Sequence, residues 1–91
     1  MAQGSKDFDA GVASFRAKDY DAVIEAFTTI LSNPSHDKRF DEDLYFYRGQ
    51  SYFHKGEYDK SLSDLNQSLT LEHFNKGTIH WYQARCYDKQ G

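Results

Sequence analysis

Cysteine and proline are almost absent from this 91-residue chain, which contains one of each, Cys86 and Pro34. A single thiol cannot form an internal disulfide and is too little for a thiolate metal site, so a reducing compartment is allowed. Sparse proline together with 16% aromatic residues argues against disorder, although only 38% of the residues are hydrophobic. The composition therefore predicts a folded chain without an internal disulfide.

An excess of positive charge is also missing. The chain has 11 lysine and arginine residues against 14 aspartate and glutamate residues, a formal net charge of -3. Most nucleic-acid binders depend on the opposite balance, so we expect no nucleic-acid partner. No apolar run approaches the length of a membrane span or of a signal-peptide core. We therefore expect a soluble chain with no membrane partner, in a compartment that is unknown, with the cytoplasm slightly favoured.

The familiar patterns of catalytic and metal sites are missing as well. The histidines His36, His54, His73 and His80 lack the spacing of a zinc site, and no HExxH motif or glycine-rich phosphate loop occurs. The spacing places no base near Cys86, so we interpret this residue as filling a small packing site. We expect no enzyme activity, no cofactor and no metal.

The length of the chain limits it to one small domain, residues 1–91. A chain of this size buries only about 60–65% of its unfolded surface, which argues against a deep enzyme cleft. Two independent cores would not fit, so we treat the chain as a single structural unit.

An internal repeat runs through most of this unit. A shift of 38 residues aligns Phe8 with Phe46, Gly11 with Gly49, Phe15 with Phe53, Tyr20 with Tyr58, Asp21 with Asp59, Ile24 with Leu62, Phe27 with Leu65 and Leu31 with Leu69. A further shift of 35 residues aligns Gly49 with Ala84 and Gly56 with Gly91. The chain is thus predicted to hold two and a half units, at about 5–35, 42–75 and 77–91.

The apolar spacing inside each unit is helical, and it predicts helices at 5–17, 20–32, 42–55, 58–71 and 77–90. Gly56 suits the left-handed residue that ends a helix, and Lys18 stands at the equivalent place in the first unit. If Lys18 is left-handed there, it costs on the order of 1 kcal/mol. Asp41 and Asn75 are predicted N-caps. The segment around Pro34 is predicted to be a solvated loop.

These residues resemble the tetratricopeptide repeat, a helix pair with the spacing W-x2-L-G-x2-Y, then A-x3-F, then P. The second unit reads Tyr45-x2-Arg48-Gly49-x2-Tyr52, followed by Tyr58, Ser61-x3-Leu65 and Leu69. The first copy departs from the pattern at Ser14, where a large aromatic residue usually packs, and the third copy lacks its second helix. The resemblance implies an all-α fold, a right-handed superhelix of antiparallel helix pairs with five helices.

Small residues are expected where the two helices of a pair approach closely, at Gly11, Gly49 and Ala84. The predicted core consists of the apolar and aromatic residues that repeat at helical spacing. These are Tyr20, Val23, Ile24, Phe27, Ile30, Leu31, Tyr52, Tyr58, Leu62, Leu65 and Leu69.

A second stripe on the first helix of each unit is the candidate site. Positions 46, 50 and 53 fall within about 60° of one another, roughly a quarter turn from the stripe at 45, 49 and 52. The resemblance implies that this stripe lines a concave groove for peptide segments. The expected groove residues are Phe8, Val12, Phe15, Phe46, Tyr47, Gln50, Phe53, Trp81, Tyr82 and Arg85.

Three aromatic groove residues that each lose about 100 Å² on binding contribute on the order of 7 kcal/mol, so micromolar affinity is expected. The alternative is that neighbouring helices cover these side chains. That alternative is stronger for Phe15 and Phe53, near the turn, than for Phe8, Phe46 and Trp81.

Several hypotheses for function stay open. The first is a module that binds a peptide segment of another protein in the groove. The second is an assembly element that self-associates, or packs on further repeats of a longer array, through its last helix. A third, weaker hypothesis is single-stranded RNA stacking with Arg16, Arg48 and Arg85, which the acidic balance disfavours. Gly91 occupies a turn position, so the chain is interpreted either as a fragment of a longer array or as ending in a true cap.

One subset of the resembling family grips the carboxylate tail of heat-shock chaperones with lysine, asparagine and arginine. The matching positions here are Phe8, Val12, Tyr47, Thr78 and Tyr82, none of which supplies the charge or amide. We predict that isothermal titration with an acidic C-terminal pentapeptide gives no binding. Micromolar binding that disappears when the terminus is amidated would contradict this prediction.

Overall fold

The computed structural model describes residues 3–71 and 76–90 of the chain, and within them every regular element is helical. The elements are α1 (Gln3–Arg16), α2 (Tyr20–Ser32), the short 3-10 helix η1 (Lys38–Phe40), α3 (Asp41–His54), α4 (Tyr58–Thr70) and α5 (Lys76–Gln90). The predicted all-α fold with five α-helices is therefore confirmed for the described residues. The helix bounds differ from the predicted ones by one or two residues at several ends.

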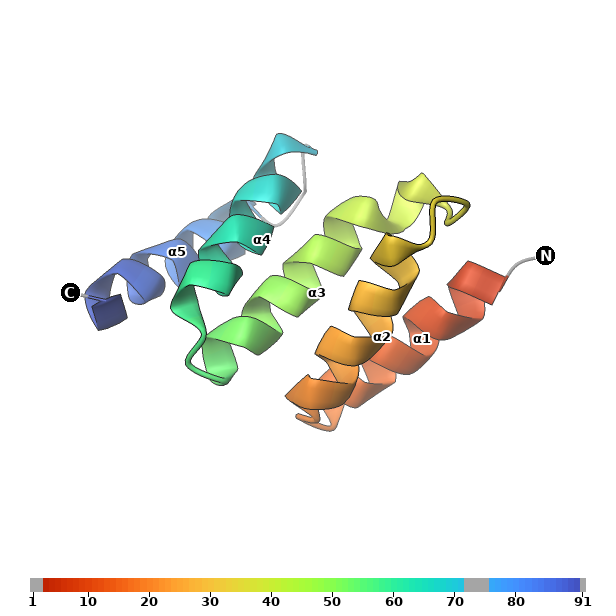
Figure 1. Ribbon diagram of the computed structural model, residues 1–91. Coiled ribbons are helices and arrows are strands. Elements are labelled where there is room, and N and C mark those ends of the chain that lie inside the picture. The colour runs from red at the N-terminus through yellow and green to blue at the C-terminus, as the bar shows by residue number, and fades with distance from the viewer. Residues whose placement is uncertain (1–2, 72–75, 91) are drawn as a thin grey trace.

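The helices lie side by side in chain order, and the two termini point away from opposite ends of the row (Figure 1). Each α-helix packs on the next one along the chain, and α3 also touches α1 and α5. The molecule is consequently elongated, with extents of 44 × 26 × 20 Å. Because contacts are made mostly between neighbours, the arrangement is that of a stacked helical repeat. Among the described residues, no helix has both the length and the apolar character needed to cross a bilayer.

The two turns inside the helix pairs have the same backbone geometry. Lys18 and Gly56 both have positive φ, at 62° and 82°. After each of them the chain closes with a matching hydrogen bond, from the Asp19 amide to the Ser14 carbonyl and from the Glu57 amide to the Tyr52 carbonyl, both 2.9 Å long. Lys18 is thus left-handed, which is the case for which a cost on the order of 1 kcal/mol is expected.

The connection between α2 and α3 differs from the predicted solvated loop. It contains η1, and the imidazole of His36 is almost completely buried. One ring nitrogen of His36 lies 2.7 Å from the Asn33 carbonyl and the other lies 2.6 Å from the Asp41 carboxylate. Asp41 is therefore the first residue of α3 and not its N-cap, a position taken by Phe40 without a side-chain cap. The other predicted N-cap, Asn75, lies outside the described residues.

The core follows the predicted register, with additions from residues that the repeat did not single out. Val23, Phe27, Ile30 and Leu65 are buried as predicted, and the remaining predicted core residues are half-buried. Leu44, Phe46 and Ile79 are unpredicted members of the core, and Cys86 is buried with them. Burial of Cys86 confirms its interpretation as a packing residue.

Helix pairs approach closely at two of the three predicted small residues. A Cβ at Gly11 would lie 2.1 Å from Cε1 of Phe27, and one at Gly49 would lie 3.0 Å from Cγ of Leu65. The third, Ala84, is exposed. Its predicted contact is with the second helix of its own pair, and the described residues contain no helix after α5, so this stays a prediction.

We predict that Gly11→Ala lowers the free energy of unfolding by about 1–3 kcal/mol, because the added methyl group would overlap the Phe27 ring. Equilibrium urea denaturation measures this as a lower midpoint. Gly77→Ala is the matched control, because a Cβ there meets nothing within 4 Å and alanine favours a helix. Equal midpoints for the two variants would contradict the close approach of α1 and α2.

Candidate functional site

Part of the expected groove is hollowed between α1 and α3. It has a volume of about 430 Å³ and is lined by Phe8, Asp9, Val12, Ala13, Arg16, Asp43 and Tyr47. The α1 residues recur at the spacing of one helix face, and the two α3 residues are one turn apart. Three predicted groove residues, Phe8, Val12 and Tyr47, are thus brought together, beside charged residues that the stripe did not include.

Aromatic packing holds Phe8 at the edge of this hollow. Its ring stacks on Phe27 with centroids 5.7 Å apart and on Phe40 with centroids 5.0 Å apart. The edge of Tyr47 approaches from α3 at 6.3 Å. Rings held on three sides have little rotational freedom, so this wall of the hollow is preorganised. Phe40 was not predicted, because it comes from the connecting segment, outside the helical register.

A chain of aromatic contacts leads from the hollow toward α5. Phe15 contacts Tyr47 at 5.1 Å and Tyr20 at 5.9 Å, and Tyr20 stacks on His54 at 4.6 Å. Beyond His54 the contacts continue to Tyr82, whose ring centroid is 6.0 Å from that of His54. These rings come from four helices, so the aromatic surface is continuous across the row of helices.

The aromatic chain is electrically neutral around pH 7. Burial, with a smaller effect from the charge of Lys18, lowers the pKa of His54 below its ordinary value of 6.5. Burial also raises the pKa of Tyr82, which keeps its hydroxyl protonated.

Phe53 contacts Tyr82, with the two ring centroids 5.1 Å apart. Phe15 and Phe53 are both half-buried. Part of each ring remains in contact with solvent.

Two expected groove residues are not open to solvent. Phe46 has an exposed fraction of only 6%, because Leu65, Leu69, Ile79 and Tyr82 pack around it. Gln50 is buried as well, and its amide nitrogen lies 3.4 Å from the Phe46 carbonyl. The expectation that Phe46 and Gln50 line an open groove is therefore wrong for the free chain. α5 covers α3 more completely than the register alone suggested.

Trp81 is the opposite case, with an exposed fraction of 51%. The guanidinium carbon of Arg85 lies 5.0 Å from the centre of its ring, which is cation–π geometry. The centroid of the Trp81 ring lies 5.0 Å from that of Tyr82 and 6.5 Å from that of Phe53. Tyr87 and Leu71 are the other large hydrophobic residues exposed in the described part of the chain. Trp81 and Arg85 are therefore available to a partner.

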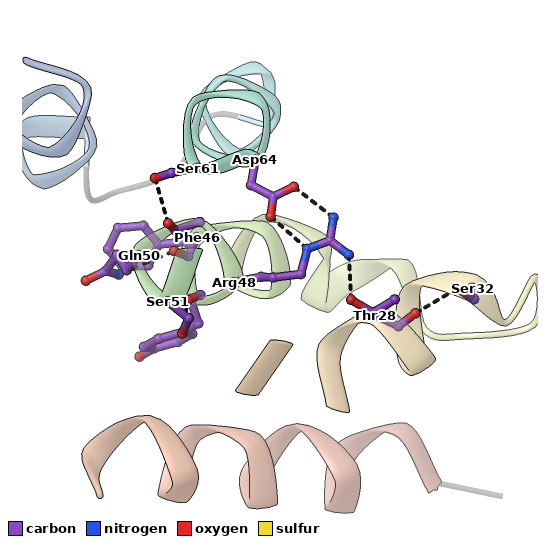
Figure 2. A network of polar contacts seen from close by, with 10 residues as sticks. Thr28, Ser32, Phe46, Arg48, Gln50, Ser51, Ser61 and Asp64 are labelled. Carbon is purple, nitrogen blue, oxygen red and sulfur yellow. Dashed lines mark hydrogen bonds and ion pairs between the residues drawn. The ribbon is translucent and has the colours of Figure 1, made fainter. Parts of the chain in front are cut away.

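A buried ion pair supports α3 from the side opposite α5, and it was missed at the sequence level. Arg48 donates from Nε and Nη2 to the two carboxylate oxygens of Asp64, at 2.7 and 2.8 Å. Its Nη1 donates to Thr28 Oγ1 at 3.1 Å, so one guanidinium joins α4, α3 and α2 (Figure 2). The rings of Tyr45 and Tyr52 lie 5.6 and 5.8 Å from it.

The charge of Arg48 is fully engaged inside the protein. Burial is the largest single effect and lowers the pKa of Arg48, but the hydrogen bonds that Arg48 donates to Asp64, together with the charge of Asp64 and smaller effects of Tyr52 and Tyr45, raise that pKa above its ordinary value. The RNA hypothesis required Arg48 on an accessible surface, so it loses one of its three arginines. A sequence signal for the pair did exist: an arginine where the repeat usually has leucine needs a carboxylate nearby, and Asp64 lies in the buried register beside Leu65.

Serine hydroxyls complete the contact between α3 and α4. Ser61 donates to the Gly49 carbonyl at 2.7 Å, and Ser68 donates to the Glu42 carbonyl at 2.9 Å. The Cys86 thiol lies 3.5 Å from the Ser61 hydroxyl. Burial raises the pKa of Cys86, which disfavours the reactive thiolate. Within residues 3–71 and 76–90, no three histidine, cysteine or acidic side chains gather as a metal site.

We predict that Asp64→Ala lowers the free energy of unfolding by about 3 kcal/mol, because it leaves the Arg48 charge buried without a partner. Chemical denaturation followed by circular dichroism measures the change. Arg48→Met combined with Asp64→Leu removes both charges and should recover most of the loss. The control, Arg39→Ala, removes an exposed arginine that pairs with Asp37 at the surface and should change little. If Asp64→Ala and Arg39→Ala behave alike, the ion pair does not have the role assigned to it.

Comparison with known proteins adds one finding. Residues 42–75 match the family model described as tetratricopeptide repeat. The match begins in the first turn of α3 and extends past the end of α4, so it covers the ion pair and both serine contacts. No curated protein and no solved structure gave a significant match to the chain.

Proposed function

Because residues 42–75 are a tetratricopeptide repeat, a fold that generally binds other proteins and is not catalytic, we propose that this chain is a peptide-binding interaction module. The observation that carries the proposal is the 430 Å³ hollow between α1 and α3, whose walls include Phe8, Val12 and Tyr47. A preformed concavity with aromatic walls and a few polar groups suits an extended segment of another protein.

The proposed contact surface is narrower than the predicted stripe. It starts in the hollow, follows the half-buried rings of Phe15, Phe53 and Tyr82, and ends at Trp81 and Arg85. Phe46 and Gln50 support this surface from inside, so their substitution would damage the core before it damaged binding. We further propose that α1 with α2 and α3 with α4 form two repeats, with α5 as a further half.

Micromolar affinity remains the expectation for this surface. Trp81 has the most surface to bury, whereas Phe8 and Tyr47 are already half-buried, so the three rings together contribute less than the roughly 7 kcal/mol of three open rings. Association costs about 4–15 kcal/mol, which consumes much of that gain. A tighter complex would require polar anchors in addition to the rings.

A second candidate function is assembly through α5, and a comparison of equivalent positions favours it. Phe8 packs against α3 and Phe46 packs against α5, but no described residue covers the equivalent Trp81 in the same way. Tyr87 has an exposed fraction of 61%. Aromatic surface of this kind fits another helix, from a second copy or from further repeats.

The test of peptide binding begins with a phage-displayed library of random dodecapeptides selected on the wild-type protein. We expect enriched peptides that bind with micromolar dissociation constants by fluorescence polarisation. Val12→Glu places a charge on the wall of the hollow and should weaken them at least about tenfold. Tyr87→Ala removes an exposed ring outside the proposed surface and serves as the matched control. No enrichment above background, or unchanged binding by Val12→Glu, would contradict the proposal.

Sedimentation velocity separates the second candidate from the first. If α5 mediates self-association, the wild-type mass exceeds that of a monomer, and both Trp81→Ala and Tyr87→Ala reduce it. If the wild type is a monomer at all concentrations tested and still binds peptides, self-association through α5 is excluded. The groove then remains as the functional surface.

A further inference from the structure

The connection between α2 and α3 contains an imidazole that is held between two hydrogen-bond acceptors. The side chain of His36 has an exposed fraction of only 6%. Its Nδ1 lies 2.7 Å from the carbonyl oxygen of Asn33, the C-cap of α2. Its Nε2 lies 2.6 Å from a carboxylate oxygen of Asp41, the first residue of α3. We call these three residues the latch, because they join the end of one helix to the start of the next.

The two acceptors of the latch have no proton to donate. A backbone carbonyl and an ionised carboxylate only accept hydrogen bonds, whereas a neutral imidazole carries a single N–H group. The neutral ring can therefore donate to Asn33 or to Asp41 but not to both, and the other acceptor then faces a lone pair. The protonated ring has an N–H group on each nitrogen and satisfies both acceptors. The latch is complete only in that form.

The charges that surround the ring favour its protonated form, although burial alone would disfavour a cation. The first turn of α3 contributes three acidic residues, Asp41, Glu42 and Asp43. The last turn of α2 has no charged side chain, and its carbonyl end is the negative end of the helix dipole, which stabilises a cation. The connection itself contributes Asp37, Lys38 and Arg39.

The acidic group within the connection responds to the same ring. The pKa of Asp37 is lowered to about 2, mainly by hydrogen bonds from Arg39 and to a smaller extent by the charge of His36. Arg39 is engaged with Asp37 in an ion pair at the surface. Acidic groups therefore outnumber basic groups around the latch.

The latch positions one wall of the hollow between α1 and α3. Phe40, the N-cap of α3, lies in the segment between His36 and Asp41. Its ring stacks on Phe8 with centroids 5.0 Å apart, and Phe8 lines the hollow. When the latch loses a hydrogen bond, the segment that carries Phe40 gains freedom, and so does the ring that packs on it. A freer wall must be ordered when a peptide binds, which weakens binding.

We propose that the latch regulates peptide binding in this hollow, an inference that rests on the proposed peptide-binding function. Protonation of His36 completes the latch and strengthens binding, and loss of that proton weakens binding. Histidine is the side chain whose charge changes between about pH 5 and 8, so the response falls within that range. His36 does not line the hollow and acts through Phe40 and Phe8, which makes it a positioning residue.

A second histidine must be separated from this effect. His54 lies in the aromatic chain, and its pKa is below 6.5 because of burial, with a smaller effect of Lys18. Its protonation in acid would place a charge between the rings of Tyr20 and Tyr82. A substitution of His36 leaves His54 in place, so the difference between wild type and such a variant isolates the latch.

The experiment measures how the binding of one peptide depends on pH. The probe is the most enriched histidine-free dodecapeptide from the selection on wild type, labelled with a rhodamine dye and followed by fluorescence polarisation. For each protein we take the ratio of the affinity at about pH 5.5 to the affinity at about pH 8. We expect the ratio for wild type to exceed that for His36→Gln about three- to tenfold, as loss of one hydrogen bond predicts.

Two further variants sharpen the comparison. Asp41→Asn supplies an amide that can donate to a neutral ring, so its ratio should resemble that of His36→Gln. His80→Gln is the matched control, because it makes the same substitution at an exposed imidazole of α5 that contacts Gln83. His80→Gln should keep the wild-type ratio.

A second measurement examines the latch without a peptide. NMR correlation of the ring nitrogens, assigned from the signals that His36→Gln lacks, distinguishes a ring with two N–H groups from a ring with one. We expect His36 to carry both protons at about pH 5.5 and one at about pH 8. The latch stabilises the fold while the ring is protonated and loses this effect as pH rises, so His36→Gln should lower the urea midpoint more at the acidic pH.

The outcomes separate this inference from the function on which it rests. Equal pH ratios for wild type and His36→Gln, or a His36 ring with a single N–H group at both pH values, would overturn the regulation and leave peptide binding intact. Failure to enrich any peptide would overturn the peptide-binding function and its regulation together, whatever the state of the ring.

Discussion

The forked ion pair between Arg48 and Asp64 is the interaction on which the middle of the molecule depends. It joins α3 to α4 through two hydrogen bonds and reaches α2 through Thr28. A guanidinium that is largely removed from water needs hydrogen-bond partners of this kind. The ion pair therefore fixes α4 against α3 within one helix pair, and the bond to Thr28 ties that pair to α2.

Periodic features of the fold could be predicted from the sequence, because a repeat copies backbone geometry together with its residues. Lys18 shows this most clearly. Nothing about a lysine favours a left-handed turn, yet the alignment with Gly56 singled out Lys18 as the equivalent turn residue, and its φ is positive. Side-chain partnerships were harder to predict. Asp64 lies in the buried register beside Leu65, but only the charge of Arg48 on the other helix of the pair explains why a carboxylate stands there.

The candidate site was predictable only in outline. Phe8, Val12 and Tyr47 share a surface as the stripe suggested, but Phe46 and Gln50 are buried although the first unit's equivalents are partly open. The repeat register predicts which face of a helix a residue occupies. The exposure of that residue to solvent depends on how closely the next helix packs against that face. Asp9, Arg16 and Asp43 escaped notice because they belong to the space between two helices and not to one stripe.

The position of Trp81 has a consequence for how this protein can be observed. It is the only tryptophan, it lies on the last described helix, and half of its surface meets water beside Arg85. In a row of helices that touch mainly their neighbours, each end opens at its own free energy. Intrinsic indole emission is consequently a local reporter of the α5 end, largely blind to events around α1.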